Sequence, residues 1–238
     1  MKPIVLIRFH KIILKEIEKM KFPNAFSGVK KIFAAEILQI IGILAMGFAA
    51  IFVVFAGVGV EADNALVGLG SLFGAGAFSF GGIIVLLLAA IFEIVGLSKA
   101  GKDEKFFKYA LYMVILGVVA SVVGSFFQSS NTTIYSVCDS VNRLCDLIST
   151  VLIVQGIMNL ANALGNAEMV AKGAVIFKAI TFVYVLAIIG TISYGILASF
   201  VFLRIISIVC LCLSLVLSFI SYILFLSYLA KAKRMLLA

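Results

Sequence analysis

The chain has 238 residues, of which 64% are hydrophobic and only 13% charged, and its mean hydropathy is +1.25. Soluble domains carry about a quarter charged residues, so this composition excludes an ordinary soluble fold and indicates an integral membrane protein. The net charge of +8 does not indicate nucleic-acid binding, because the basic residues are spread between apolar segments instead of forming one patch with stacking aromatics. We expect them to meet anionic lipid head groups.

Residues 1–27 form the first predicted element, an amphipathic helix that lies in the head-group region on the cytoplasmic side. Apolar side chains recur there at helical spacing, on one face: Leu6, Phe9, Ile13, Ile17 and Met20. Basic residues interrupt every apolar stretch, which argues against a cleaved signal peptide. We expect Pro23 to end this helix, and residues 28–238 to form the membrane domain.

Long apolar runs follow, and a spanning helix needs about 20 mostly apolar residues. Six runs qualify: 32–55, 78–97, 108–127, 145–164, 174–197 and 205–229. We therefore predict an all-α polytopic membrane protein, a transmembrane bundle of six spans. The glycine-rich residues 56–77 are a loop, a helix extension or a re-entrant segment in this interpretation.

The basic residues predict the orientation of the spans. With the N-terminus in the cytoplasm, 17 of the 19 Lys and Arg residues lie on the inner side, and only Arg143 and Arg204 lie outside. The positive-inside rule then predicts a multi-pass protein of the cell membrane with both termini in the cytoplasm. The lysine-rich stretch from Lys99 to Lys108 holds the connection between the second and third spans on that inner side.

A weak regularity runs through the inner segments. The stretches "SGVKKIF", "AGKDEKFF" and "KGAVIF" place Gly28, Gly101 and Gly173 at nearly equal intervals. This spacing suggests three helical-hairpin repeats, 28–100, 101–172 and 173–238, related about an axis along the membrane normal. The alternative is that any six-span chain with inner lysines acquires such a period.

Small residues four apart mark the faces on which helices approach closely in lipid. In the third span these are Gly117, Ser121 and Ser125, and in the sixth they include Ser214 and Ser218. We predict that these residues form helix-packing surfaces, which favours a tight bundle.

The fourth span carries the clearest polar pattern, formed by Gln155, Asn159, Asn162 and Asn166. Their spacing of four, three and four residues confines them to one stripe of a helix. Either they hydrogen-bond to neighbouring helices, or they line a cytoplasm-facing cavity together with Glu36 and Glu93. We expect no close carboxylate pair in the spans and no relay of buried Asp, Glu, His or Arg residues across the bilayer.

Catalytic machinery is not evident. The single histidine, His10, lies on the predicted surface helix, and the four cysteines have no metal-binding spacing, so we expect no enzyme, metal or cofactor. The sequence favours a non-catalytic membrane component that packs with copies of itself or with a membrane partner. The alternative is a channel or facilitative transporter for ions or small solutes, with the polar stripe in its wall.

Overall fold

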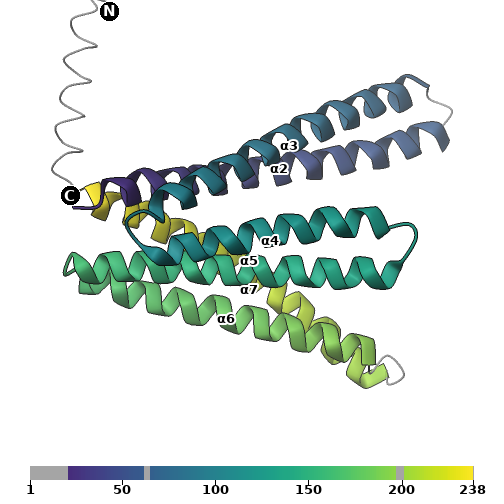
Figure 1. The fold of residues 1–238 in the computed structure, drawn as a ribbon. Coiled ribbons are helices and arrows are strands. Elements are labelled where there is room, and N and C mark those ends of the chain that lie inside the picture. Colours follow the sequence, from purple (N-terminus) through teal and green to yellow (C-terminus); the bar gives the residue numbers. More distant parts are fainter. Residues whose placement is uncertain (1–20, 62–64, 197–200, 238) are drawn as a thin grey trace, which may run out of the picture. The chain divides into compact units, whose positions relative to one another are not determined.

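The computed structural model describes residues 21–61, 65–196 and 201–237, and all regular structure in these ranges is α-helical (Figure 1). Their six helices are α2 (Pro23–Glu61), α3 (Ala65–Ala100), α4 (Lys105–Phe127), α5 (Thr132–Ala163), α6 (Ala167–Ile196) and α7 (Val201–Leu237). Each contains a stretch long and apolar enough to cross a membrane, by length and composition. The prediction of an all-α chain with six apolar helices is confirmed, and it indicates a multi-pass membrane protein. The predicted amphipathic face in residues 1–20 lies outside the described residues.

Several helices are longer than the apolar runs that predicted them. Helix α2 begins at Pro23, so residues 23–27 belong to the first long helix and not to the interfacial segment to which we assigned them. Proline is well placed in a first helical turn, where its missing N–H has no acceptor within the helix. At the other end, α2 continues to Glu61 and α3 begins at Ala65, so the helix extension is the correct alternative for most of residues 56–77.

The largest difference concerns α5. This helix begins at Thr132, whereas the apolar run begins at residue 145. Asn131 caps it, because its side-chain oxygen accepts hydrogen bonds from the backbone N–H groups of Thr133 (3.1 Å) and Ile134 (3.2 Å). The residues that we predicted as an outer connection therefore extend the helix by more than three turns.

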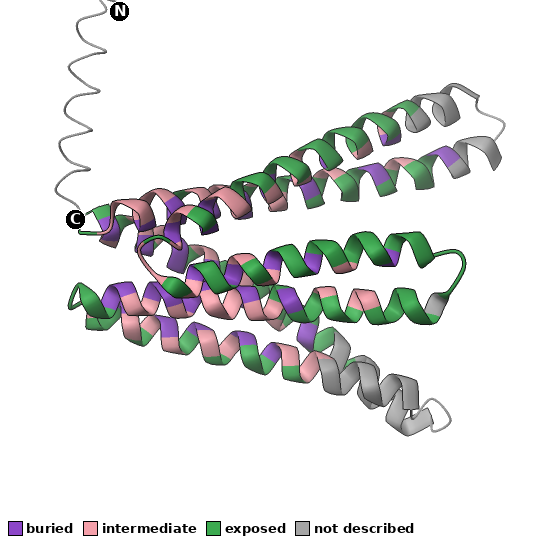
Figure 2. Ribbon diagram, in the orientation of Figure 1, coloured by how far each residue is buried: buried purple, intermediate pink, exposed green. Residues whose placement is uncertain are grey.

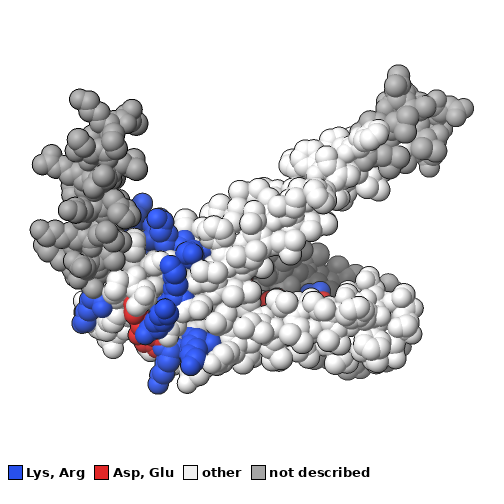
Figure 3. Space-filling view, turned by 45° about the horizontal axis from the view of Figure 1, so that its top comes forward, with Lys and Arg blue, Asp and Glu red and all other residues white. Residues whose placement is uncertain are grey.

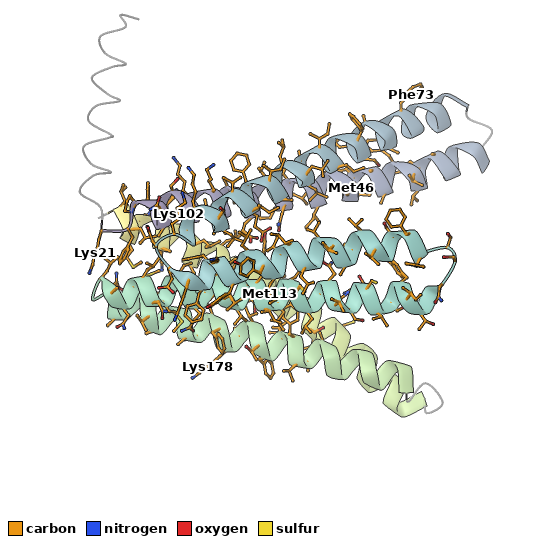
Figure 4. The ribbon with its side chains drawn as sticks, in the orientation of Figure 1. Lys21, Met46, Phe73, Lys102, Met113 and Lys178 are labelled. Atoms are coloured by element: carbon orange, nitrogen blue, oxygen red, sulfur yellow. The ribbon has the colours of Figure 1, made fainter. Side chains whose placement is uncertain are left out.

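The chain forms two compact units. The smaller unit comprises residues 30–96, and the larger unit comprises residues 1–29 and 97–238. In the smaller unit α2 and α3 contact each other closely at positions where one of the two helices has a glycine. A Cβ atom on Gly42 would lie 2.7 Å from Leu86, one on Gly82 would lie 3.1 Å from Met46, which Figure 4 labels, and the rings of Phe52 and Phe78 stack at 5.5 Å.

In the larger unit α5 is central, because it packs against α4, α6 and α7, and α6 packs against α7. The buried positions of α4 are three, four or seven residues apart: Phe107, Ala110, Val114, Gly117 and Gly124. The ring of Phe107 lies on Gly156 of α5, where a Cβ atom would be 2.9 Å from it. The fully buried side chains of α5, among them Ile153, Val154 and Ile157, lie in its second half (Figure 2). The three hairpin repeats stay a prediction.

Polar contacts join the first turn of α2 to the connection between α3 and α4, within the larger unit. Asp103 accepts hydrogen bonds from the backbone N–H of Ala25 (2.7 Å) and from the side-chain amide of Asn24 (2.8 Å). It therefore caps a helix that is distant in sequence. Lys21 donates to the carbonyl oxygen of Ala163, at the end of α5 (2.7 Å). Figure 4 shows Lys21 and Lys102 at this same end of the larger unit.

Candidate functional site

Three charged residues lie inside α5: Asp139 and Arg143 precede the predicted apolar run 145–164, and Asp146 lies at its start. Asp139 and Arg143 form an ion pair one helical turn apart, with 2.8 Å between Oδ2 and Nε. Asp146 follows three residues later. Successive residues of a helix turn by about 100°, so the three side chains share one face of α5. These residues add ionisable groups to a long helix in which the sequence had singled out only uncharged polar residues, and the expectation that the spans hold no close carboxylate pair stays a prediction.

The packing of α4 on α5 gives the depth of these charges. A Cβ atom on Gly117 would lie 2.9 Å from Oδ1 of Asn142 and 3.2 Å from Cβ of Cys145. Gly117 is near the middle of the apolar part of α4, residues 109–127, which measures about 28 Å at the helical rise and so matches a bilayer core. If α4 crosses the membrane, Arg143 and Asp146 therefore lie close to its midplane.

These charged side chains are not covered by the described part of the larger unit. The side chain of Arg143 is 75% exposed and that of Asp139 is 38% exposed. Asp146 is exposed as well, and among the described residues it forms no ion pair. Tyr184 on α6 is close enough for the charges of Asp146 and Arg143 to act on its hydroxyl group. A charged residue at the centre of a spanning helix costs about 2.5 to 3.5 kcal/mol in insertion measurements, so this face requires an explanation.

Small polar residues complete the same face of α5. Ser136 and Ser140 are both exposed, lie four residues apart and precede Arg143. The hydroxyl of Ser140 donates to the carbonyl oxygen of Ser136 (2.8 Å), so this donor is satisfied within the helix. We call the set Ser136, Asp139, Ser140, Arg143 and Asp146 the polar face of α5.

The polar stripe that the sequence predicted lies further along α5 and past its end. Gln155 and Asn159 are half-buried, and among the described residues their side chains form no hydrogen bond. Asn162 is exposed. Asn166 has a structural task, because its side chain accepts a hydrogen bond from the backbone N–H of Met169 (3.0 Å) in the first turn of α6.

Glu36 and Glu93 belong to the smaller unit. Glu36 is buried, 7% exposed, on α2. Glu93 on α3 accepts a hydrogen bond from the side-chain amide of Gln39 (3.4 Å), which lies one turn after Glu36. The two glutamates therefore face a shared polar contact between α2 and α3. A single cavity that joins them to Gln155 and Asn159 stays a prediction, since the two sets lie in different units.

The predicted helix-packing residues divide into two groups. Gly117 is buried against α5, and Ser214 is buried on α7. Ser121, Ser125 and Ser218 are exposed in the single chain, and the hydroxyl of Ser125 donates to the carbonyl oxygen of Val122 (2.7 Å). Their role in packing against another chain stays a prediction.

Most of the described lysine and arginine side chains of the larger unit gather in one cluster (Figure 3), which includes residues at the start of α4, the start of α6 and the end of α7, whereas Arg143 lies elsewhere. At the start of α6, Glu168 and Lys172 form an ion pair, and Lys231 of α7 lies next to Lys172. Among the described residues, no three His, Cys, Asp or Glu side chains are grouped so as to hold a metal ion. No protein-family model matches the chain, and no curated protein or solved structure matches it.

Sequence reasoning missed four of the five residues of the polar face because hydropathy is low between residues 128 and 144, and it did not single out Asp146, which lies at the start of the predicted run 145–164. Two local signals do indicate a helix there. Asn131 is a favoured N-cap residue, and Asp139 and Arg143 have the spacing of a helical ion pair.

Proposed function

We propose that the protein is a non-catalytic membrane component, and that it acts by packing the polar face of α5 against a further membrane helix, from a copy of itself or from a partner. The observation that carries this proposal is the exposure of Arg143 and Asp146 at the level of the centre of α4. Ionisable residues in spanning helices almost always face other protein or water, because lipid cannot solvate them. A helix that covers this face supplies the missing contacts.

The composition of the face supports packing more than chemistry. Ser136 and Ser140 let another backbone approach closely, which is the main source of helix association in lipid. The carboxylate of Asp139 is already engaged in the ion pair with Arg143. This arrangement favours an adaptor or assembly role over catalysis.

Orientation and lipid contacts are part of the same proposal. The chain is embedded in the cell membrane with both termini in the cytoplasm. In this orientation the basic residues at the end of α3, at the start of α4 and at the end of α7 all lie at the cytoplasmic leaflet. Each Lys or Arg near an anionic head group contributes roughly 1 kcal/mol to that attachment.

A photo-reactive residue in place of Ser136 tests the packing proposal in membranes of cells that make the full chain. We expect a covalent adduct with a second polypeptide, and a loss of that adduct when Arg143→Leu is added. A photo-reactive residue at Val119, which is 52% exposed on α4, is the matched control and should label mainly lipid. If Ser136 labels no polypeptide, the proposal is wrong.

A second candidate function, passage of a small solute or ion, is favoured by one observation. Gln155 and Asn159 are half-buried amides with no hydrogen bond among the described residues, which fits a wetted wall. The double variant Gln155→Leu, Asn159→Leu should then abolish solute flux into liposomes while the chain still assembles. Unchanged flux through a correctly assembled double variant would exclude this function.

A further inference from the structure

We propose that the helix that covers the polar face of α5 is α5 of a second copy, with Arg143 of each copy paired to Asp146 of the other. This inference rests on the proposed function, since it names the partner for the same face. The two copies are related by a twofold axis along the membrane normal, so both have the same orientation in the bilayer.

The arrangement of charges on the face points to this partner. Arg143 uses its Nε atom for Asp139 of its own chain, which leaves the two terminal nitrogens of a 75% exposed guanidinium without a carboxylate among the described residues. Asp146 has no ion-pair partner in the same ranges. In the described ranges each copy therefore presents one guanidinium edge and one carboxylate that form no ion pair within their own chain.

The geometry of a helix makes these two groups self-complementary. Arg143 and Asp146 lie about 60° apart around α5 and about 4.5 Å apart along it. When the two α5 helices are related by a twofold axis parallel to them, Arg143 of one copy and Asp146 of the other differ in height along the helix by about 4.5 Å. An arginine side chain is long enough to cover that difference. The symmetry then forms the second, equivalent pair. Each guanidinium then bridges two carboxylates, Asp139 of its own chain and Asp146 of its neighbour.

A partner of different sequence needs two charged residues of opposite sign to pair with both Arg143 and Asp146. A single basic residue on such a partner pairs Asp146 but leaves the terminal nitrogens of Arg143 open, and a single acidic residue does the reverse. A second copy supplies both signs at the required spacing of three residues.

The small residues on the face allow the required approach. Ser136 and Ser140 lie one turn apart on the same side as Arg143, and the hydroxyl of Ser140 is satisfied within its own helix. Two α5 helices can therefore come close at these small side chains, which brings each Arg143 within reach of the other chain.

Charge reversal in two differently tagged full-length chains tests the pairing, with both chains made in the same cells and purified in native lipid. Wild-type chains should co-purify. Arg143→Asp in both chains places only acidic residues on both faces, and Asp146→Arg in both chains places two arginines on each, so either change should lower co-purification about tenfold or more. A chain with Arg143→Asp combined with a chain with Asp146→Arg restores opposite charges at both contacts and should recover it.

The mixed pair also separates lost pairing from misfolding, because it contains the same two polypeptides that fail separately. Lys178→Asp is the control reversal: Lys178, labelled in Figure 4, is exposed on α6 and is not part of the polar face of α5, so we expect wild-type co-purification. Wild-type chains that do not co-purify, or a mixed pair that recovers nothing while each variant accumulates, would overturn the pairing.

If the reversed chains do not accumulate, the photo-reactive residue at Ser136 in chains with wild-type charges decides the matter. An adduct that carries both tags supports the second copy. An adduct with a different polypeptide overturns this inference and leaves the proposed function standing, whereas no polypeptide adduct overturns both.

Discussion

A Cβ atom on Gly173 of α6 would lie 2.5 Å from the hydroxyl oxygen of Tyr228 on α7. On its other side the same atom would meet the side chain of Met158 on α5. Gly173 is therefore the point at which three helices of the larger unit come together, and only a residue without a side chain fits there.

The variant Gly173→Ala should destabilise the larger unit by about 1 to 3 kcal/mol, because an added methyl group forces Met158 and Tyr228 to move. Thermal unfolding in detergent, followed by the loss of helical circular dichroism, measures this effect. Gly81→Ala is the matched control, since a Cβ atom at that helical position in α3 meets nothing within 4 Å. It should be neutral or stabilising by up to about 1 kcal/mol, and an equal loss in both variants would contradict our account.

The hydroxyl group of Tyr228 is buried, and among the described residues it has no hydrogen-bond partner. Burying an unsatisfied polar group costs about 1 to 3 kcal/mol. Tyr228→Phe keeps the ring in place and removes that group, so the variant should unfold at a higher temperature than the wild type. A lower unfolding temperature would show that the hydroxyl has a partner that stabilises the fold.

Asp103 should stabilise the start of α2 although it is far away in sequence. Asp103→Ala removes the acceptor for the backbone N–H of Ala25 and for the amide of Asn24. The loss of a capping side chain costs about 0.5 to 2 kcal/mol. Hydrogen exchange at the first turn of α2 should accelerate in this variant and remain unchanged in the neighbouring control Lys102→Ala, whose side chain is exposed. Equal protection in both variants would exclude the cap.

The predicted polar stripe should divide into residues with different roles. Asn166→Ala removes the acceptor for the N–H of Met169 and should destabilise α6 by about 1 kcal/mol. Asn162→Ala should change stability by less than about 0.5 kcal/mol, because its side chain is exposed. Denaturant titration of both variants measures the difference, and identical losses would indicate that the stripe acts as one unit.

Much of the fold could be predicted from apolar composition. Each of the six apolar runs lies within one long helix to within a residue at its ends, as far as the described residues go, and the predicted end of the third span, residue 127, is the last residue of α4. Helix ends were predicted less well, because a helix continues past its apolar part wherever capping and neighbouring helices satisfy its backbone. The start of α5 at Thr132 is the clearest case.

The spacing of small residues predicted only some of the positions at which helices of this chain pack against each other. A spacing of four residues advances about 40° around a helix at each step, so Gly117, Ser121 and Ser125 drift off one face. The buried positions of α4 instead keep to a period near seven, which holds Gly117 and Gly124 against α5. Which of the small residues face the chain itself depends on the neighbouring helix, and a single sequence does not contain that information.

The sequence by itself determined that this chain is helical and suited to a membrane, because nearly two thirds of its residues are hydrophobic and they occur in runs of spanning length. Only the structure decided that Arg143 belongs to the long helix α5 and not to a connection between helices. The physical reason is that hydropathy measures one segment at a time, whereas depth is set by contact with another helix. The packing of Gly117 on Asn142 and Cys145 places the charges of α5 beside the middle of α4.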